Sequence, residues 1–185
     1  MTMNKDLEKI VLSEAEIAAL VKKAAAWLDE RFQNSEQPPL AICILKGSVF
    51  FFCDVVRAMK TPVQLDFMTV SSYGNSTKTS GVPKIVTDLS ASVQGRDVIL
   101  IEDIVDSGHT LASMRGLLVG RGANSFTVVT LFDKKSRRQV EAQVDFSCYE
   151  IGDEFVVGYG LDYAQNYRNL PYIGILKREI YDNKN

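Results

Sequence analysis

Two adjacent carboxylates and a turn of small residues form the most informative chemical pattern of the sequence. Glu102 and Asp103 directly follow the apolar run 98–101, and the turn 106–110 comes shortly after them. Adjacent carboxylates can accept hydrogen bonds from both hydroxyls of a vicinal diol. Free backbone N–H groups and hydroxyls at the turn suit a phosphate monoester, and Gly108 permits its close approach. The pattern alone is equally consistent with ribose-phosphate binding and with an ordinary strand-to-helix turn.

The elements around this pattern indicate an α/β fold. Residues 41–45 and 98–101 are short continuous apolar runs, typical of strands that are buried on both faces of a parallel sheet. Because strands alternate with helices, right-handed crossovers predict a mostly parallel twisted sheet flanked by helices. Ligands of such sheets bind beyond the carboxyl ends of the strands, which is where Glu102 and Asp103 are expected.

Apolar spacing divides the chain into these elements. A capping box of Ser13 and Glu16, followed by apolar residues at three- and four-residue steps, predicts a helix over 13–32. Further helices are expected at 49–59 and from about 110 to 119. The expected strands are 41–45, 63–70, 98–101, 126–131, one near Phe146, 155–158 and 172–176.

A polar stretch at residues 71–83 interrupts the alternation of strands and helices. It has too little apolar surface to offset its ordering entropy, so we expect a mobile loop. Structureless loops of about this length inside compact domains are often lids over active sites. An exposed hairpin connection without a role is the alternative interpretation.

The composition excludes several classes of function. The 185 residues fit one domain, residues 1–185, with 46% hydrophobic and 24% charged residues. With 21 Lys and Arg against 23 Asp and Glu, the net charge is −2, and the basic excess of non-specific nucleic-acid binding is absent. No apolar run approaches the roughly 20 residues of a membrane span, and acids stand where a secretory signal would be basic. We therefore expect a cytoplasmic protein with neither nucleic-acid nor membrane partners.

One histidine and three cysteines restrict the site chemistry further. The single imidazole, that of His109, cannot build a zinc site that needs two or three within one chain. Cys43, Cys53 and Cys148 are an odd number without a C-x-x-C pair, and each lies in or beside an apolar run. Such thiols are usually buried core residues in a reducing compartment.

Five separate motifs together resemble the purine phosphoribosyltransferase family. Residues 98–111 are similar to the family's phosphoribosyl pyrophosphate signature. In order along the chain, the other motifs are Leu45-Lys46-Gly47, Ser72-Tyr73, Asp133-Lys134 with Arg138, and residues 155–163 with Arg168. The resemblance covers about residues 40–176. It implies the phosphoribosyltransferase fold, in which the chain ends form a small strand-rich hood.

The resemblance also implies an activity. The family transfers a 5-phosphoribosyl group from phosphoribosyl pyrophosphate to N9 of a 6-oxopurine, releases pyrophosphate and requires Mg²⁺. For this chain it implies purine salvage with hypoxanthine, guanine or both as the base. The family suggests a homodimer or homotetramer.

By the same resemblance, one set of residues would bind the phosphoribosyl group. Glu102 and Asp103 would hold the ribose hydroxyls and help to place Mg²⁺, which prefers oxygen ligands, and Asp162 would be a further ligand of the metal. The residues around the 5′-phosphate would be Asp106, Ser107, Gly108, His109 and Thr110. His109 would contribute its backbone and not its ring.

A second set would bind the leaving group. Lys46 and Gly47 would contact pyrophosphate through their backbone, in a non-proline cis peptide, and Arg138 and Arg168 would contact it through their side chains. The loop residues that would close over the reacting groups are Ser72 and Tyr73.

A third set would bind the base. Lys134 would donate to the purine 6-oxo group, Phe155 would stack on the purine face, and the backbone of Val156 would contact the base edge. Asp162 would also belong to the base-binding residues. Asp106 would approach N7 as proton acceptor or electrostatic stabiliser. The other expected catalytic residues are Glu102 and Asp103, at the ribose.

Without the resemblance, ordinary structure would explain most of these residues: a solvated turn at Lys46, a solvated charge run at residues 134–138 and a core strand at Phe155. Two alternative functions remain. One is a phosphoribosyltransferase for xanthine or a pyrimidine, against which Lys134, Phe155 and Asp162 argue. The other is a ribose-phosphate-binding regulatory protein of the same fold.

Overall fold

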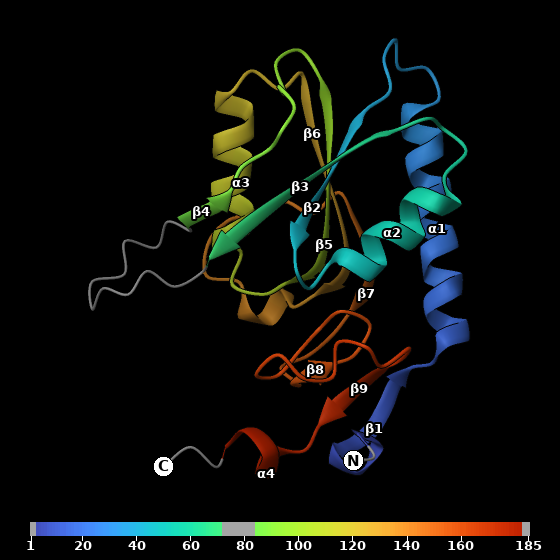
Figure 1. The fold of residues 1–185 in the computed structure, drawn as a ribbon, viewed down its shortest axis with the longest axis vertical. Coiled ribbons are helices and arrows are strands. Elements are labelled where there is room, and N and C mark those ends of the chain that lie inside the picture. Colours follow the sequence, from blue (N-terminus) through green and yellow to red (C-terminus); the bar gives the residue numbers. More distant parts are fainter. Residues whose placement is uncertain (1–2, 72–83, 183–185) are drawn as a thin grey trace.

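The computed structural model describes residues 3–71 and 84–182, which form two sheets and the helices around them (Figure 1). The larger sheet carries the helices at one end of the molecule. The smaller sheet lies at the other end and pairs residues 7–12 with residues 173–176, near the two ends of the described chain.

The larger sheet has six strands. All its neighbouring strands are parallel except the edge strand β4, which runs antiparallel to β3. This arrangement confirms the mostly parallel sheet that the sequence predicts. In spatial order the strands are β4 (Lys84–Thr87), β3 (Gln64–Ser71), β2 (Leu40–Leu45), β5 (Asp97–Val105), β6 (Ser125–Asp133) and β7 (Phe146–Glu150).

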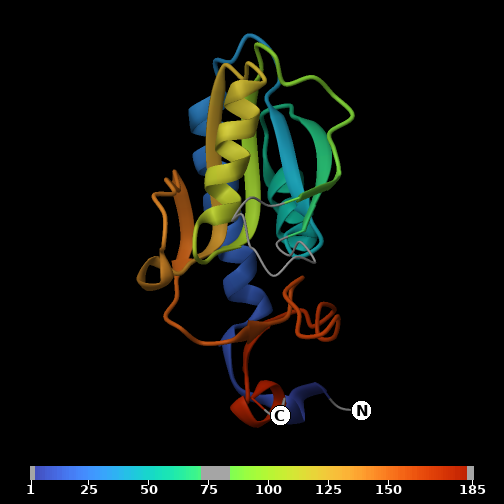
Figure 2. The ribbon, with the colours of Figure 1, turned by 90° about the vertical axis from the view of Figure 1, so that its left-hand side faces the viewer.

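Helices cover both faces of this sheet, with α3 on one face and the pair α1 and α2 on the other (Figures 1 and 2). Their bounds are α1 (Glu14–Phe32), α2 (Val49–Ala58) and α3 (His109–Gly120). The predicted capping box begins α1: Ser13 N donates to Glu16 Oε2 at 2.8 Å, and Glu16 N donates back to Ser13 Oγ at 3.3 Å. Both free donors at the start of the helix are therefore satisfied.

Alternate residues of each parallel strand pack on opposite faces. Ala41 and Cys43 of β2 lie in one buried cluster together with Phe51 of α2. Leu40 and Ile42 lie in a second cluster with the buried residues of α3. Because both faces are covered, the strand is apolar at every one of these positions, which is why it can be recognised as a continuous run in the sequence.

The smaller sheet is the strand-rich hood that the resemblance implies. It has the order β1-β9-β8 with antiparallel neighbours and consists of β1 (Leu7–Leu12), β8 (Val156–Val157) and β9 (Ile173–Leu176). The short helices are η1 (Met3–Asp6), η2 (Lys135–Arg137) and α4 (Arg178–Tyr181). Ile17 of α1 packs in one cluster with Ile173 of the hood and Ile99 of the large sheet, so that α1 joins the two sheets.

Several elements differ from the sequence-based expectation. The sequence pattern did not indicate β1, and β8 is limited to two residues where residues 155–158 were expected. β5 continues to Val105, so Glu102 and Asp103 lie within the strand rather than after it. None of the described helices is long and apolar enough to cross a membrane.

The cysteines only partly match the expectation of buried thiols. Cys43 is buried and Cys148 half-buried, and burial raises the pKa of each thiol to about 12. Cys53 is exposed, so the prediction is wrong for this residue. It lies on α2 beside Phe52, and the helix buries Phe51, Phe52 and Val55 while Cys53 faces solvent.

Candidate active site

The site begins where β2 and β5 part. β2 pairs with β5 only as far as Cys43 and Ile101, whereas β6 accompanies β5 to Val105. The last residues of β5 therefore keep one strand neighbour and lose the other. Glu102 and Asp103 lie in this part of β5, beside the turn that leads from β2 into α2.

Both carboxyl groups are held in an environment that disfavours their charge. Glu102 is 7% exposed, and burial together with the neighbouring Asp103 raises its pKa well above the usual range. Burial raises the pKa of Asp103 to about 6, against a hydrogen bond that Ile104 N donates to Asp103 Oδ1 at 2.7 Å. A cation or several donor hydroxyls at this position would reverse the penalty.

The turn after β2 packs tightly against Asp103. A Cβ added at Gly47 would overlap Asp103 Oδ2, and one added at Gly160 would overlap the Gly47 carbonyl. Gly160 also has a φ of +102°, which favours glycine. The cis peptide implied for the Lys46-Gly47 pair is found one bond earlier, between Leu45 and Lys46. Small residues thus bring together the turn, the strand and the hood.

The turn 106–110 enters α3 as expected. Gly108 has a φ of +89°, and a Cβ there would be 2.9 Å from atoms of Ala142 and Arg138. No side chain among the described residues caps the first turn of α3, so its N–H groups are available to an anion. His109 begins the helix, and its Nε2 lies 3.3 Å from Gln139 Oε1.

The residues predicted for the base meet in one cavity of about 300 Å³. All five of them line it, although they come from the ends of β5 and β6 and from the hood. The full lining is Ile104, Asp106, Lys134, Arg137, Asp153, Phe155, Val156, Leu161 and Asp162.

Lys134 is the buried cation of this cavity. Lys134 is only 7% exposed, and burial lowers the pKa of its ammonium group. Lys134 Nζ donates to the Glu154 carbonyl at 2.7 Å. An ammonium group has three donors and no acceptor, so this contact orients the group while it can still donate to a ligand.

Phe155 is supported by two aromatic residues of the hood. Its ring stacks on Tyr181 of α4 with a centroid distance of 4.9 Å. The ring of Tyr163 packs against it in a T-shaped arrangement with a centroid distance of 5.7 Å. The contact with Tyr181 was not predicted, because it joins residues that are far apart in the sequence. It holds the Phe155 ring from one side while the residue lines the cavity.

Asp162 and Arg168 form an ion pair at 2.8 Å, and Arg168 also donates to the Gly160 carbonyl at 2.7 Å. The charges of Asp162 and Arg168 both act on Asp103, in opposite senses. Among the described residues, no three His, Cys, Asp or Glu side chains gather as a metal-binding cluster. Glu102, Asp103 and Asp162 therefore do not form a ready-made triad of metal ligands, although Asp103 and Asp162 are close enough to interact electrostatically.

Arg138 lies at the turn 106–110, which we call the phosphate turn after the group predicted to bind there. It donates to the Asp106 carbonyl at 2.9 Å and forms an ion pair with Asp133. Its role toward pyrophosphate stays a prediction. Ser72 and Tyr73, the predicted lid residues, lie outside the described residues.

Two charged residues of the cavity were missed, Arg137 and Asp153. Arg137 donates from Nε to Asp106 Oδ1 at 3.0 Å and from a terminal nitrogen to Asp153 Oδ1 at 2.6 Å. The sequence shows Arg137 only as part of a charge run, and no local signal points to Asp153, because the contacts span 31 and 16 residues.

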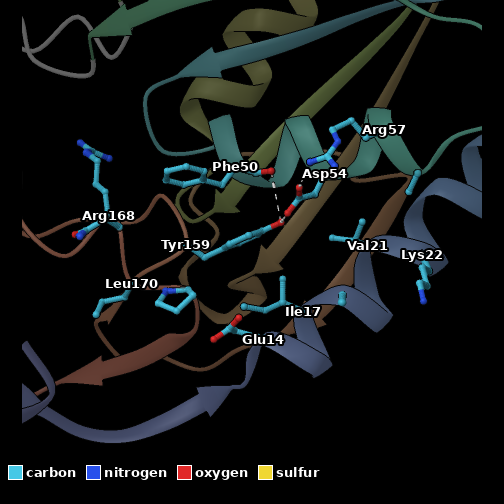
Figure 3. A pocket seen from close by; sticks show the side chains of 14 residues that line it. Glu14, Ile17, Val21, Lys22, Phe50, Asp54, Arg57, Tyr159, Arg168 and Leu170 are labelled. Carbon is cyan, nitrogen blue, oxygen red and sulfur yellow. Dashed lines mark hydrogen bonds and ion pairs between the residues drawn. The ribbon is translucent and has the colours of Figure 1, made fainter.

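A larger cavity of about 600 Å³ lies between α1, α2 and the hood (Figure 3). Ile17, Val21 and Leu170 give it a mainly apolar wall, and Tyr159 reaches across to Asp54, to which its hydroxyl donates at 2.6 Å. Of the predicted site residues that the structure describes, Arg168 alone lines it. Because the residues predicted for the base line the smaller cavity and not this one, we place the base in the smaller cavity.

Comparison with known proteins agrees with this site. The phosphoribosyl transferase domain family matches residues 9–164. A hypoxanthine-guanine phosphoribosyltransferase of Bacillus subtilis is 50% identical over 180 residues, which cover 97% of this chain and 99% of that relative. Another from Streptococcus pyogenes is 46% identical over 179 residues, covering 97% and 98%. The crystal structure of a hypoxanthine phosphoribosyltransferase from Staphylococcus aureus superposes with a TM-score of 0.93 at 43% identity, covering 99% and 98%.

These matches show the class of protein: the chain belongs to the phosphoribosyltransferase family. Its similarity over nearly the whole chain places it with the hypoxanthine-guanine phosphoribosyltransferases within that family. The resemblance, the fold class and the prediction of a phosphoribosyl-transferring enzyme of purine salvage are confirmed. The regulatory alternative is disfavoured.

Proposed function

We propose that the chain transfers the 5-phosphoribosyl group of phosphoribosyl pyrophosphate to N9 of hypoxanthine or guanine, giving the nucleotide and pyrophosphate, with the residues described above. The observation that carries this proposal is the 300 Å³ cavity in which Asp106, Lys134, Phe155, Val156 and Asp162 meet beside the phosphate turn. A base bound there lies next to a bound 5-phosphoribosyl group, so the two reactants are brought together.

The phosphoribosyl group binds across the end of β5. The 5′-phosphate accepts hydrogen bonds from the first turn of α3, whose donors no described side chain caps. The ribose hydroxyls donate to Glu102 and Asp103, which compensates these carboxylates for their burial. Pyrophosphate lies at the Lys46-Gly47 backbone, with Arg168 as its cation on the hood side and Arg138 at the phosphate turn.

The acidic residues fit Mg²⁺. This ion keeps several waters and binds through one or two carboxylates plus substrate phosphates, so a closed cluster of protein ligands is not required. Asp103 and Asp162 would hold it, with Glu102 behind them, and the raised pKa of Asp103 marks a place where a cation is favoured. When bound, Mg²⁺ neutralises charge on the pyrophosphate group.

The protein contributes positioning and electrostatics to the reaction. As pyrophosphate leaves, the ribosyl group gains oxocarbenium character, and the carboxylates of Glu102 and Asp103 stabilise this positive charge. N9 of the base, whose proton is on N7, then forms a bond to the anomeric carbon as the bond to pyrophosphate breaks, and the N7 proton leaves to Asp106 or to water, so that the base of the nucleotide is neutral. Asp106 accepts the hydrogen bond of N7 and stabilises the positive charge that develops on the purine ring.

The base is selected by Lys134. Its ammonium group donates to the 6-oxo oxygen of hypoxanthine or guanine, whereas the 6-amino group of adenine would present hydrogens to it. Sites built to hydrogen-bond one substrate group can reject an analogue without it by as much as 10⁴ to 10⁵. The enzyme acts in the cytoplasm as a homodimer or homotetramer.

The test is a set of kcat/KM measurements with phosphoribosyl pyrophosphate, Mg²⁺ and either hypoxanthine, guanine, xanthine or adenine. We expect oxopurine turnover, no measurable adenine turnover, and a loss of at least about 10²-fold in Lys134→Met with the KM for phosphoribosyl pyrophosphate unchanged. Lys135→Met is the matched control, because Lys135 pairs with Glu150 outside the cavity and should be silent. Robust adenine turnover, or full oxopurine turnover by Lys134→Met, contradicts the assignment.

A further inference from the structure

Arg137 bridges two carboxylates at the base cavity. Its Nε donates to Asp106 Oδ1 at 3.0 Å, and a terminal nitrogen donates to Asp153 Oδ1 at 2.6 Å. All three residues line the 300 Å³ cavity together with Lys134 and Phe155. The bridge therefore joins the end of β5 to the segment that enters the hood, directly at the residue assigned to purine N7.

The bridge is poorly placed to serve folding stability. The side chains of Arg137, Asp106 and Asp153 are 48%, 44% and 71% exposed. Exposed ion pairs contribute little to the free energy of unfolding, because solvent screens the charges and ordering long side chains costs entropy. The side chains of the Lys135 and Glu150 ion pair are also exposed, at 63% and 60%, but this pair lies outside the cavity. What distinguishes Arg137 is the residue that it contacts.

The contact leaves Asp106 with one occupied and one available oxygen. Arg137 takes Oδ1, and among the described residues no group donates to Oδ2. A carboxylate that accepts only at one oxygen rotates less freely, and the planar guanidinium fixes the direction of the donor. Asp153 holds the other side of the guanidinium, and this hydrogen bond lowers the pKa of Asp153.

We propose that Arg137 is a positioning residue for base binding and transfer, which holds Asp106 Oδ1 so that Oδ2 is presented to N7 of the purine, with Asp153 as its anchor. The proposal rests on the assigned role of Asp106. It adds a three-residue relay to that role: Asp153 orients Arg137, and Arg137 orients Asp106. The competing idea is a gate, in which Arg137 blocks Asp106 and must move away before the base binds.

Steady-state kinetics separate these ideas. Under the positioning proposal, Arg137→Gln lowers kcat/KM for hypoxanthine by roughly tenfold, as expected for a carboxylate that is no longer oriented, and leaves the KM for phosphoribosyl pyrophosphate unchanged. Arg137→Lys recovers part of the loss, because an ammonium group can reach one carboxylate but cannot fork to two. Asp153→Asn gives a smaller loss than Arg137→Gln. Lys135→Gln is the matched control and stays within about twofold of the parent.

A double-mutant cycle tests whether Arg137 acts through Asp106. In an Asp106→Asn background, Arg137→Gln should cost less than about twofold, because the carboxylate that it positions is gone. A loss that repeats in full in this background, a silent Arg137→Gln, or a gain in kcat/KM as the gate requires would each overturn the proposal. A parent-like Asp106→Asn enzyme would instead overturn the role of Asp106 itself, so the two failures are distinguishable.

Discussion

Asp103 and Asp106 lie three residues apart in the chain, yet different parts of the structure hold them. Asp103 lies within β5, packed against Gly47, and burial raises its pKa to about 6. Asp106 follows the strand, is 44% exposed, and is held by the side chain of Arg137. The backbone fixes the first carboxylate, and neighbouring side chains fix the second.

The difference separates two kinds of sensitivity. On the side of the turn there is no room at Asp103, because Gly47 and Gly160 allow the backbone of the turn and the hood to approach. Any added atom must move the backbone there. Around Asp106 a lost contact can be replaced by water, so changes should affect orientation and rate while the fold persists.

The largest effect should come from filling the space at Asp103. In Gly47→Ala the added methyl group overlaps Asp103 Oδ2, which must move the turn or the carboxylate. We expect kcat/KM for phosphoribosyl pyrophosphate to fall by roughly 10²-fold or more, the scale of a misplacement of about 1 Å. Steady-state kinetics with a thermal melt of the same sample measures the loss.

Gly116→Ala provides the control for this variant. Gly116 lies in α3 with no atom within 4 Å of an added Cβ, so alanine should leave activity unchanged and stabilise the helix by about 0.5 to 1 kcal/mol. Gly160→Ala, which meets the Gly47 carbonyl, should repeat the loss. Normal activity in Gly47→Ala would show that the surroundings of Asp103 tolerate change as well as those of Asp106. The proposed difference between the two carboxylates would then be wrong.

An intermediate effect should appear in stability. Asp103→Asn keeps the size and the acceptor for Ile104 N but removes a carboxyl group whose folded-state pKa of about 6 lies above the unfolded value of about 3.8. A carboxyl group whose pKa is raised on folding destabilises the folded state once the pH exceeds the unfolded value. The parent therefore loses stability as the pH rises from about 4 to 6. At pH 7 and without Mg²⁺, we expect Asp103→Asn to unfold with a free energy about 1 to 3 kcal/mol higher than the parent.

The same measurement at pH 4 should show a gain of less than about 1 kcal/mol, because Asp103 is then protonated in the folded chain and already about half protonated in the unfolded chain. Asp106→Asn is the matched comparison: it removes an exposed ion pair and should change the unfolding free energy by less than about 1 kcal/mol at either pH. Denaturant unfolding at the two pH values gives all four numbers. A gain that is equal at pH 4 and pH 7 would refute burial as its cause.

The sequence was sufficient for features that depend on local pattern. The runs in β2 and β5 are apolar because both faces of the sheet are covered, and the Ser13 and Glu16 spacing specified the start of α1. The end of β5 could not be predicted, because Glu102 and Asp103 interrupt the apolar run although the strand continues through them. Its length is set by pairing with β6, which is a tertiary contact.

The candidate site divides in the same way. Motif residues such as Asp106 and Lys134 could be predicted because the resemblance assigns them one by one, and the structure brings them into one cavity. The side chains that hold them could not. Arg137 contacts Asp106 across 31 residues, and Tyr181 packs on Phe155 from the last helix of the chain. Such support is visible only when the fold places distant segments together.

The smallest effect should come from His109, whose side chain, like that of Asp106, is held only by an exposed side-chain contact. Its backbone begins α3, but its ring makes only an exposed contact with Gln139 at 3.3 Å. One exposed hydrogen bond contributes about 0.5 to 1.5 kcal/mol at most, and asparagine can keep a polar group there. His109→Asn should therefore stay within about twofold of the parent in kcat/KM across a pH-rate profile, since the substitution retains the backbone N–H that we propose as a donor to the 5′-phosphate. Because this is the only histidine of the chain, the loss of one limb of that profile would assign the limb to its ring. That result would place a titrating side chain in the turn 106–110, where we propose that His109 acts through its backbone alone.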